Sequence, residues 1–387
     1  MVIAGETSGD LHAAALVRAA QRRNNEISFF GIGGEELEKT GMEICRPARE
    51  MAVLGVSEVL RKYFFFRKTF QDMLRLLQER KPDAVLLVDY PGFNLRFAKK
   101  AHGSGFKIIY YICPQVWAWN RGRIPSMAEN VDRLISIFPF EADVFRGTKL
   151  KVDFVGHPLV SLTEAARAAP LVSLPWGGGL LRPPAADYAK AGSRTPKVAI
   201  LPGSRKQEIS LILPVMARAA DILRKKNPNA GFIIAAASRD AIGWIEETLS
   251  AMGMGGRFTV VADQTRQILR QADAAWVASG TATIETALMG CPMVVVYRVR
   301  MLTYLAGRML IRVPFLGMVN IVAGRQICPE FIQQAATPEN LAQAIAPLLA
   351  GGPERNKMIS ELDRVRSILG SPGAEDRAAK ILLQELA

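Results

Sequence analysis

Hydrophobic and polar positions follow two alternating patterns along this chain. Short apolar runs, many of them β-branched, are followed by stretches in which apolar residues recur at helical spacing. Alternation of this kind is typical of right-handed βαβ units around a parallel sheet. The predicted strands are residues 1–4, 27–32, 84–88, 107–112, 134–138 and 152–155 in the first half, and 198–201, 232–237, 258–261, 274–278 and 293–297 in the second. We therefore predict an α/β protein with two doubly wound domains.

A stretch rich in proline and glycine separates the two series of strands, and such a composition is typical of a linker. We place an N-terminal domain at 1–165, a linker at 166–196 and a C-terminal domain at 197–352. Residues 353–387 read as two helices divided at Gly370–Gly373, with no strand after them. Terminal helices of this kind could pack on either domain.

The turn after residues 198–201 has the features of a phosphate site. Ligands of open α/β sheets bind beyond the carboxyl ends of the strands. Gly203 lets a ligand approach the backbone, Ser204 stands at the expected N-cap of the next helix, and Arg205 adds a forked cationic donor. The N–H groups and dipole of the helix start also favour an anion. An ordinary capped turn with a solvated arginine is the alternative.

A second turn of similar chemistry follows residues 274–278. Ser279, Gly280 and Thr281 offer backbone and hydroxyl donors to phosphate oxygens. Glu285, about one turn into the next helix, could accept hydrogen bonds from a ribose diol or could complete a capping box. Two turns of this kind in one domain favour a nucleotide ligand.

In the first half, Asp89 directly follows the apolar run 84–88. A carboxylate at the mouth of a buried strand is suited to act as a general base, although a helix cap or a loop-pinning hydrogen bond would also explain it. Candidate pocket residues lie in neighbouring turns, and the aromatic ones could instead pack under a loop: Ser8, Gly9, Asn94, Gln115 and Trp117. The glycine-rich turns 5–10 and 31–34 match neither the full GxGxxG pattern nor a P-loop, which argues against NAD and ATP.

Residues 51–68 combine apolar side chains with flanking cations. The apolar members are Val53, Leu54, Val56, Phe64, Phe65 and Phe66. If buried, they form core with a basic rim. If exposed, they form an interfacial membrane anchor or an acyl-chain site, with lysine and arginine facing anionic lipid.

Composition narrows the class of partner. The chain has 387 residues, 49% hydrophobic and 22% charged, and a net charge of +13. This charge indicates an anionic partner, but no finger or RNP-like pattern points to nucleic acid. The four cysteines form no CxxC pair and only three histidines are present, so we expect no metal site. We also expect the cysteines to be free thiols in a reducing cytoplasm. No apolar run approaches the roughly 18 residues of a membrane span. The chain begins within a predicted strand, so a residue or two could precede it.

Seven motifs, spread in order over both halves, together resemble the lipid-A-disaccharide synthase family of lipid-linked glycosyltransferases. They are AGETSGD (4–10), GIGG (31–34), VDYPGFN (88–94), PQVWAW (114–119), FVGHPL (154–159), LPGSR (201–205) and SGTAT (279–283). Residues 171–196 depart from the resemblance, because this stretch is longer and richer in proline and glycine than the family's interdomain segment.

The resemblance implies a GT-B fold, in which two Rossmann-like domains face a cleft. It also implies transfer of a diacylglucosamine from UDP-2,3-diacylglucosamine to 2,3-diacylglucosamine 1-phosphate (lipid X), with inversion to a β-1,6 disaccharide and release of UDP. Asp89 would be the base, Arg205 a ligand of the donor phosphates, and Glu285 and Asn320 donor-site residues. No metal or other cofactor is expected. The enzyme would be cytoplasmic and peripheral on the anionic surface of the inner membrane.

Two other functions fit parts of the pattern. A UDP-N-acetylglucosamine 2-epimerase also needs a UDP site and carboxylates, but no lipid site. A non-catalytic, membrane-associated protein that binds UDP-sugar or lipid would need no base. A homodimer is compatible with all three functions.

Overall fold

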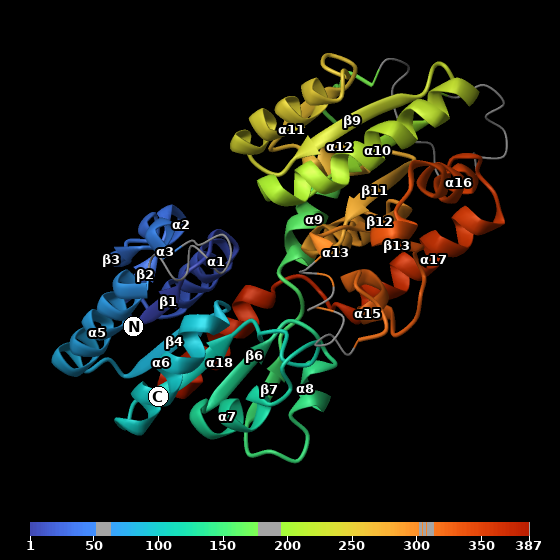
Figure 1. Cartoon of the computed structure of the whole chain (residues 1–387). Helices are drawn as coiled ribbons and strands as arrows, with labels where there is room; N and C mark the ends of the chain where they lie inside the picture. The colour runs from blue at the N-terminus through green and yellow to red at the C-terminus, as the bar shows by residue number, and fades with distance from the viewer. Residues whose placement is uncertain (52–62, 177–194, 302–303, 305–306, 308–312, 387) are drawn as a thin grey trace. The chain divides into compact units, whose positions relative to one another are not determined.

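The computed structural model describes residues 1–51, 63–176, 195–301, 304, 307 and 313–386 (Figure 1). The chain divides into two compact units. The first unit comprises Met1–Pro158 together with Leu369–Ala387, and the second comprises Leu159–Ile368.

The first unit is built on a seven-stranded parallel sheet with the order β3-β2-β1-β4-β5-β6-β7. Its strands are β1 Val2–Ala4, β2 Phe30–Gly33, β3 Glu43–Pro47, β4 Ala84–Val88, β5 Lys107–Tyr111, β6 Arg133–Ser136 and β7 Lys151–Phe154. Its helices are α1 Thr7–Arg23, α2 Glu35–Glu38, α3 Ala48–Met51, α5 Tyr63–Arg80, α6 Pro91–Gly103, α7 Arg123–Asn130, α8 Glu141–Val144 and α18 Ala374–Leu386.

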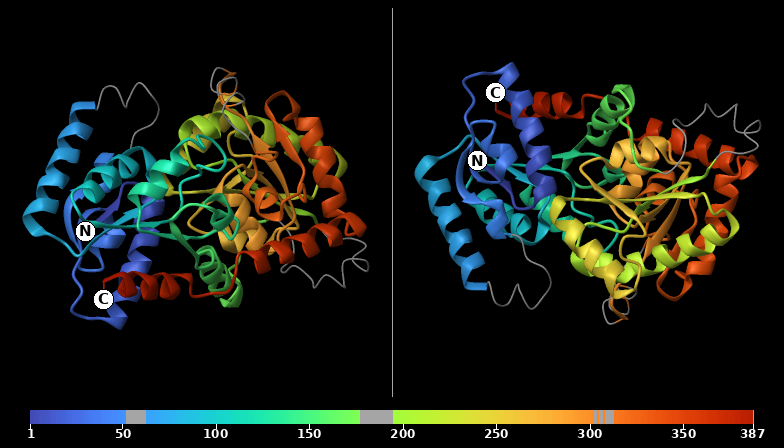
Figure 2. Two further views of the ribbon diagram at one scale, coloured as in Figure 1. Left: turned by 90° about the horizontal axis from the view of Figure 1, so that it is seen from below. Right: turned by 90° about the horizontal axis from the view of Figure 1, so that it is seen from above.

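The strand order reverses between β1 and β4, where Ala4 pairs with Val88. Right-handed crossovers on either side of such a reversal place the helices on opposite faces of the sheet. Helices α5, α6 and α7 accordingly cover one face, and α1 covers the other with α18 beside it (Figure 2). The reversal leaves an opening beyond the carboxyl ends of β1 and β4, which is the usual ligand position in such sheets.

The second unit repeats this plan with six parallel strands in the order β10-β9-β8-β11-β12-β13. Its strands are β8 Lys197–Leu201, β9 Gly231–Ala236, β10 Thr259–Ala262, β11 Ala274–Ala278, β12 Met293–Tyr297 and β13 Glu330–Ile332. Its helices include α9 Leu159–Ala168, α10 Lys206–Lys226, α11 Arg239–Ala251, α12 Thr265–Gln271, α13 Thr281–Leu288, α15 Met318–Ala323, α16 Pro338–Leu349 and α17 Pro353–Ile368. Here the reversal lies between β8 and β11, where Leu201 pairs with Val277.

The predicted α/β class and the predicted strands are confirmed. Sequence reasoning missed β3 and β13, which lie at the sheet edges. Neither is a continuous apolar run, since β3 reads EICRP and β13 reads EFI.

The division of the chain differs from the expected boundaries. Helix α9 belongs to the second unit, because Arg167 donates to the carbonyl of Leu288 at 3.2 Å and α9 packs on α12 and α13. Part of the expected linker also packs there: Gln271 donates to Val172 at 2.9 Å, and the side chain of Trp176 is buried. The terminal helices separate, with α17 in the second unit and α18 in the first. Over the described ranges, no helix is both long and apolar enough to span a membrane.

Candidate active site

Asp89 lies in a constrained turn at the strand reversal of the first unit. Asp89 and Tyr90 have φ values of 46° and 49°, a region that costs free energy for residues other than glycine. The backbone N–H of Asp89 donates to Tyr111 at 3.1 Å. Its carbonyl accepts the Tyr110 hydroxyl at 2.5 Å and the Asn94 amide at 2.8 Å. These bonds fix the turn, and with it the direction of the carboxylate.

The surroundings of Asp89 suit proton transfer near neutral pH. Burial, and secondarily the charge of Glu6, raise the pKa of Asp89 from 3.8 to about 6, against a lowering contribution from the N–H of Tyr90. A base with a pKa close to the working pH is most effective. Asp89 is not the N-cap residue of α6, because Tyr90 holds that position.

The turns after β1 and β4 pack directly on one another. A Cβ at Gly5 would lie 2.5 Å from the ring of Tyr90, so only glycine fits there. The Tyr90 hydroxyl donates to the carbonyl of Met51 at 2.9 Å. Of the expected pocket residues in this turn, Ser8 is exposed on the first turn of α1, and Gly9 is buried close to the backbone of Val88. The structure therefore brings both turns to the strand reversal.

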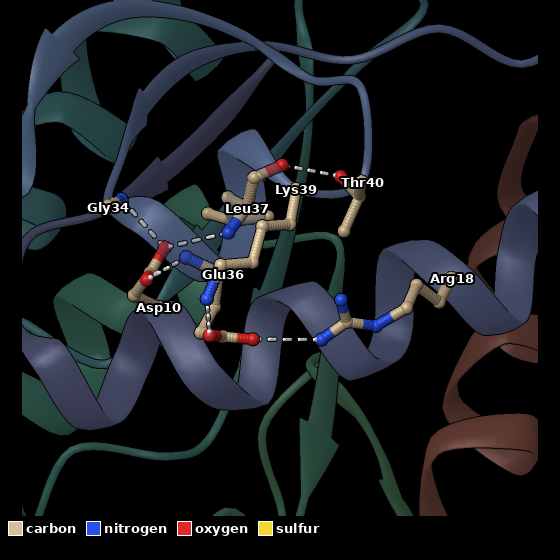
Figure 3. A network of polar contacts seen from close by, with 7 residues as sticks. All are labelled: Asp10, Arg18, Gly34, Glu36, Leu37, Lys39 and Thr40. Carbon is tan, nitrogen blue, oxygen red and sulfur yellow. Dashed lines mark hydrogen bonds and ion pairs between the residues drawn. The ribbon is translucent and has the colours of Figure 1, made fainter.

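Asp10 holds the next turn in place (Figure 3). Its buried carboxylate accepts backbone N–H bonds from Gly34 at 2.6 Å, Glu36 at 3.0 Å and Leu37 at 3.3 Å. These are the donors at the start of α2, which has no cap from its own N-cap residue. Asp10 thus links the AGETSGD and GIGG motifs structurally, with its oxygens engaged by the chain itself.

Two of the expected pocket residues are buried. The amide nitrogen of Asn94 donates to the carbonyls of Ile3, Val88 and Asp89, so this fully buried side chain supports the Asp89 turn. Trp117 is likewise buried, and its indole N–H donates to Glu141 at 3.3 Å. The expectation that these two side chains line a pocket is therefore corrected. Gln115 is exposed.

Glu141 is a feature that sequence reasoning missed. Its carboxyl group is 1% exposed and accepts the Trp117 indole N–H and the backbone N–H of Phe138. Burial raises the pKa of Glu141 to about 8. It fixes the PQVWAW segment, which follows the strand next to β4. No turn motif marks Glu141, so its role depends on tertiary contacts alone.

In the second unit, the turn after β8 differs in detail from the expectation. The N-cap of α10 is Arg205, not Ser204. The backbone N–H of Ser204 donates to the Glu208 carboxylate at 3.0 Å, and the N–H of Arg205 also bonds to it. This is one half of a capping box, with the N3 glutamate reaching back to the helix start. Part of the expected anion cradle is thus occupied by the chain's own carboxylate.

The remaining features of this turn are compatible with a phosphate ligand. A Cβ at Gly203, which has φ 115°, would lie 2.2 Å from Glu208, so glycine is required. The side chain of Arg205 is exposed, and it forms no ion pair with any residue that the structure describes. Its guanidinium is therefore available to an anion beyond β8.

The turn after β11 lies next to the turn after β8, as the strand pairing requires. Gly280 is the N-cap of α13, and Thr281 is exposed on its first turn. The Ser279 hydroxyl donates to the carbonyl of Leu316 at 2.7 Å, so it pins a loop. Glu285 lies beyond the N3 position, which excludes a capping box, and it pairs with Arg266 at 2.7 Å.

Asn320 is not placed to touch a ligand directly. It is fully buried on α15, and its oxygen accepts the N–H groups of Ile327 and Cys328. Its nitrogen donates to the carbonyl of Cys328 and to the Glu330 carboxylate. Because both ends of the amide are hydrogen-bonded within the protein, the expectation that Asn320 contacts the donor sugar directly is corrected. Glu330 in turn accepts the N–H groups of Leu316 and Gly317, so Asn320 supports the loop that Ser279 also holds.

The expected membrane residues are only partly described. Val53, Leu54 and Val56 lie outside the described residues. Phe64 is 78% exposed at the start of α5. Phe65 and Phe66 pack against the core of the first unit, and their rings meet edge to face with centroids 5.7 Å apart. Phe64 is therefore the aromatic side chain of this group that faces outward.

Neither unit presents a ready metal site in its described part. No group of three or more histidine, cysteine, aspartate or glutamate side chains there is arranged to hold a metal ion. The four cysteines are free thiols.

Solved structures with the same fold include a glycotransferase and an epimerase. The glycotransferase of kitacinnamycin has a TM-score of 0.60 at 18% identity, with 100% of this chain and 98% of that chain covered. A putative UDP-N-acetylglucosamine 2-epimerase from Listeria monocytogenes has a TM-score of 0.59 at 13% identity, covering 99% and 93%. At such identities the likeness establishes the fold alone, which is of the GT-B type.

Sequence relatives are more specific. The family model described as lipid-A-disaccharide synthetase matches residues 1–173 and 181–382. The lipid-A-disaccharide synthase of Syntrophus aciditrophicus is 41% identical, over 99% of this chain and 96% of that protein. The enzyme of the same name from Geobacter metallireducens is also 41% identical, over 100% and 97%. The chain therefore belongs to the lipid-A-disaccharide synthase family of glycosyltransferases.

Proposed function

We propose that this protein transfers 2,3-diacylglucosamine from its UDP-linked donor to the 6-hydroxyl of 2,3-diacylglucosamine 1-phosphate. The products are the β-1,6-linked lipid A disaccharide 1-phosphate and UDP. Family membership supports the reaction type, and the two strand-reversal turns support the division of labour between the units.

The observation that carries the proposal is the fixed, partly buried carboxylate of Asp89, with a pKa raised to about 6. Inversion by direct displacement needs one base to take the proton of the attacking hydroxyl. Asp89 would take this proton as the C–O bond to the donor sugar forms, while the bond to the UDP oxygen breaks on the opposite face of the sugar. Asn94 and Tyr110 act on its backbone and so keep the carboxylate in position.

The donor diphosphate would be held by the second unit. The exposed guanidinium of Arg205 and the N-terminus of α10 supply positive charge beyond β8. The neighbouring turn of α13 adds the backbone of Gly280 and the hydroxyl of Thr281. These groups would stabilise the charge that develops on the leaving UDP.

We further propose that no metal ion takes part. The leaving diphosphate can be neutralised by the arginine and the helix dipole. Turnover should accordingly persist in excess EDTA, and a loss that Mg²⁺ restores would contradict this part of the proposal.

Association with the cytoplasmic face of the inner membrane is also proposed. Phe64 is exposed at the start of α5, and Arg67 and Lys68 are exposed one turn later. An aromatic side chain beside cations suits an interface with anionic lipid. Replacing Phe64 by serine should weaken binding to phosphatidylglycerol vesicles, whereas the exposed Leu171 of the second unit offers a matched control as Leu171→Ser. Equal binding of both variants and the parent protein would contradict the assignment.

The deciding assay incubates the purified protein with the two monosaccharide lipids and follows both disaccharide and UDP. Formation of both in equal amounts supports the synthase. Conversion of UDP-N-acetylglucosamine, supplied in a separate reaction, to its 2-epimer, with no disaccharide formed from the two lipids, would instead indicate the epimerase. Binding of UDP without any turnover would indicate a non-catalytic protein.

A further inference from the structure

A groove on the first unit lies between α6 and α7. Its polar lining includes Arg96 and Lys99 from α6, and Arg123, Ser126 and Asn130 from α7. Leu95, Met127 and Val131 form apolar parts of its walls. The groove therefore combines three cations with short hydrogen-bonding side chains.

The positive charge of this groove is not neutralised locally. None of the lining residues is an aspartate or a glutamate. Arg96 and Lys99 are exposed, and among the described residues neither these two nor Arg123 forms an ion pair. The Arg123 guanidinium carbon lies over the Trp119 ring, 5.4 Å from its centroid. Three clustered cations without a carboxylate favour an anionic ligand.

The groove adjoins the proposed base. Pro91 and Gly92 line it, and they follow Asp89 and Tyr90 directly at the start of α6. Burial, and next the charge of Asp89, raise the pKa of the Tyr110 hydroxyl, while Arg123 is among the groups that lower it. The same hydroxyl donates to the carbonyl of Asp89. Arg123 and Asp89 thus both lie within electrostatic range of the Tyr110 hydroxyl.

Size and reach restrict what the groove can hold. Its volume is ≈ 190 Å³, below the roughly 300–1,000 Å³ of pockets that enclose a whole drug-sized ligand. It suits a small polar group, not a complete acylated sugar. At about 1.5 Å per helical residue, Arg96 stands roughly 8 Å and Lys99 roughly 12 Å along the axis from Pro91. Both cations thus lie further along α6 than Pro91, which follows Asp89 and Tyr90 in the chain.

We propose that the groove between α6 and α7 binds the phosphate group of the acceptor sugar, with Arg96, Lys99 and Arg123 as its ligands. This inference rests on the proposed synthase function. Binding the phosphate at one end of the acceptor would place the hydroxyl at the other end beside Asp89. The groove would then select phosphorylated acceptors over their phosphate-free counterparts.

The test compares the double variant Arg96→Gln/Lys99→Gln with Lys100→Gln. Both replace exposed cations on the same helix, but Lys100 does not line the groove. In neutral detergent micelles, the double variant should raise the KM for the phosphorylated acceptor at least tenfold, with kcat and the donor KM unchanged. With the parent protein, an acceptor that lacks the phosphate should show a similarly raised KM. The double variant should not raise the KM for this acceptor any further. The control should match the parent protein throughout.

A binding measurement separates this inference from the synthase function. Calorimetric titration with soluble glucosamine 1-phosphate needs no turnover, so it reports on the groove even if no disaccharide is formed. The double variant should bind this probe at least tenfold more weakly than the parent protein and Lys100→Gln. Equal affinities would overturn the proposal. A loss seen only on phosphatidylglycerol vesicles, and not in neutral micelles, would also overturn it, because the cations would then serve a membrane surface.

Discussion

The two units share one architecture, but the turns at their strand reversals have opposite characters. In the first unit, Asp89 is a partly buried carboxylate in a left-handed backbone turn that three hydrogen bonds hold. In the second unit, Arg205 is an exposed cation at the start of a long helix. The same position beyond a parallel sheet thus presents a partly buried carboxylate in one unit and an exposed cation in the other, which are the proposed base and the proposed phosphate ligand.

The difference shows what each task requires of its surroundings. A base needs partial burial, because desolvation brings the pKa of a carboxyl group close to neutral pH. A phosphate ligand needs exposed donors and a positive end of a helix, and burial would cost it free energy. Variants at Asp89 and Arg205 should therefore fail in different ways.

The largest effect is expected at Asp89. Asp89→Asn keeps the size of the side chain and tolerates positive φ, but it cannot take a proton. The value of kcat should fall by about 10²- to 10⁴-fold, the usual contribution of a general base. Affinity for UDP, measured by calorimetry, should stay unchanged. Full activity of Asp89→Asn would show that another group is the base.

A smaller effect, on UDP binding and not on kcat, is expected at Arg205. Arg205→Gln should weaken UDP binding and raise the donor KM by about 10- to 100-fold, as loss of a charged hydrogen bond predicts. Arg205→Lys keeps the positive charge but loses the forked pair of donors. Its UDP affinity and donor KM should therefore lie between those of the parent protein and Arg205→Gln. A variant that loses kcat while keeping UDP affinity would contradict the assignment of Arg205 to the donor phosphates.

The smallest expected effect concerns stability, and it applies to the first unit alone. Asp89 has a pKa of about 6 when folded and an ordinary value of 3.8, so the folded protein binds more protons between these values. Stability should therefore fall as pH rises through this window. Asp89→Asn lacks this penalty and should be more stable by about 1–3 kcal/mol at pH 7. Urea unfolding of both proteins at pH 7 and pH 4 measures this difference in stability. If Asp89→Asn were equally stabilised at pH 4, ionisation of the buried carboxyl group would not be the cause.

Much of the fold followed from the sequence, because buried parallel strands are continuous apolar runs with glycine-rich turns at their ends. The edge strands β3 and β13 were not predicted, since they lack such runs. The positions of Asp89 and Arg205 were also predictable from their place after a strand. The roles of buried polar residues were not, because they depend on partners distant in sequence: Asn94 bonds to Ile3, Glu141 to Trp117, and Asn320 to Glu330.

The pH dependence of kcat/KM tests the central claim, that Asp89 is the base, most directly. Activity needs the ionised carboxylate, so the rate should fall about tenfold per pH unit below about pH 6 and level off above it. Burial lowers the pKa of His12 to about 4 and that of His157 to about 3, so these two histidines should not contribute to a limb near pH 6. The residual activity of Asp89→Asn should lack this limb. An acidic limb near pH 6 that survives in Asp89→Asn would contradict the assignment of Asp89 as the base.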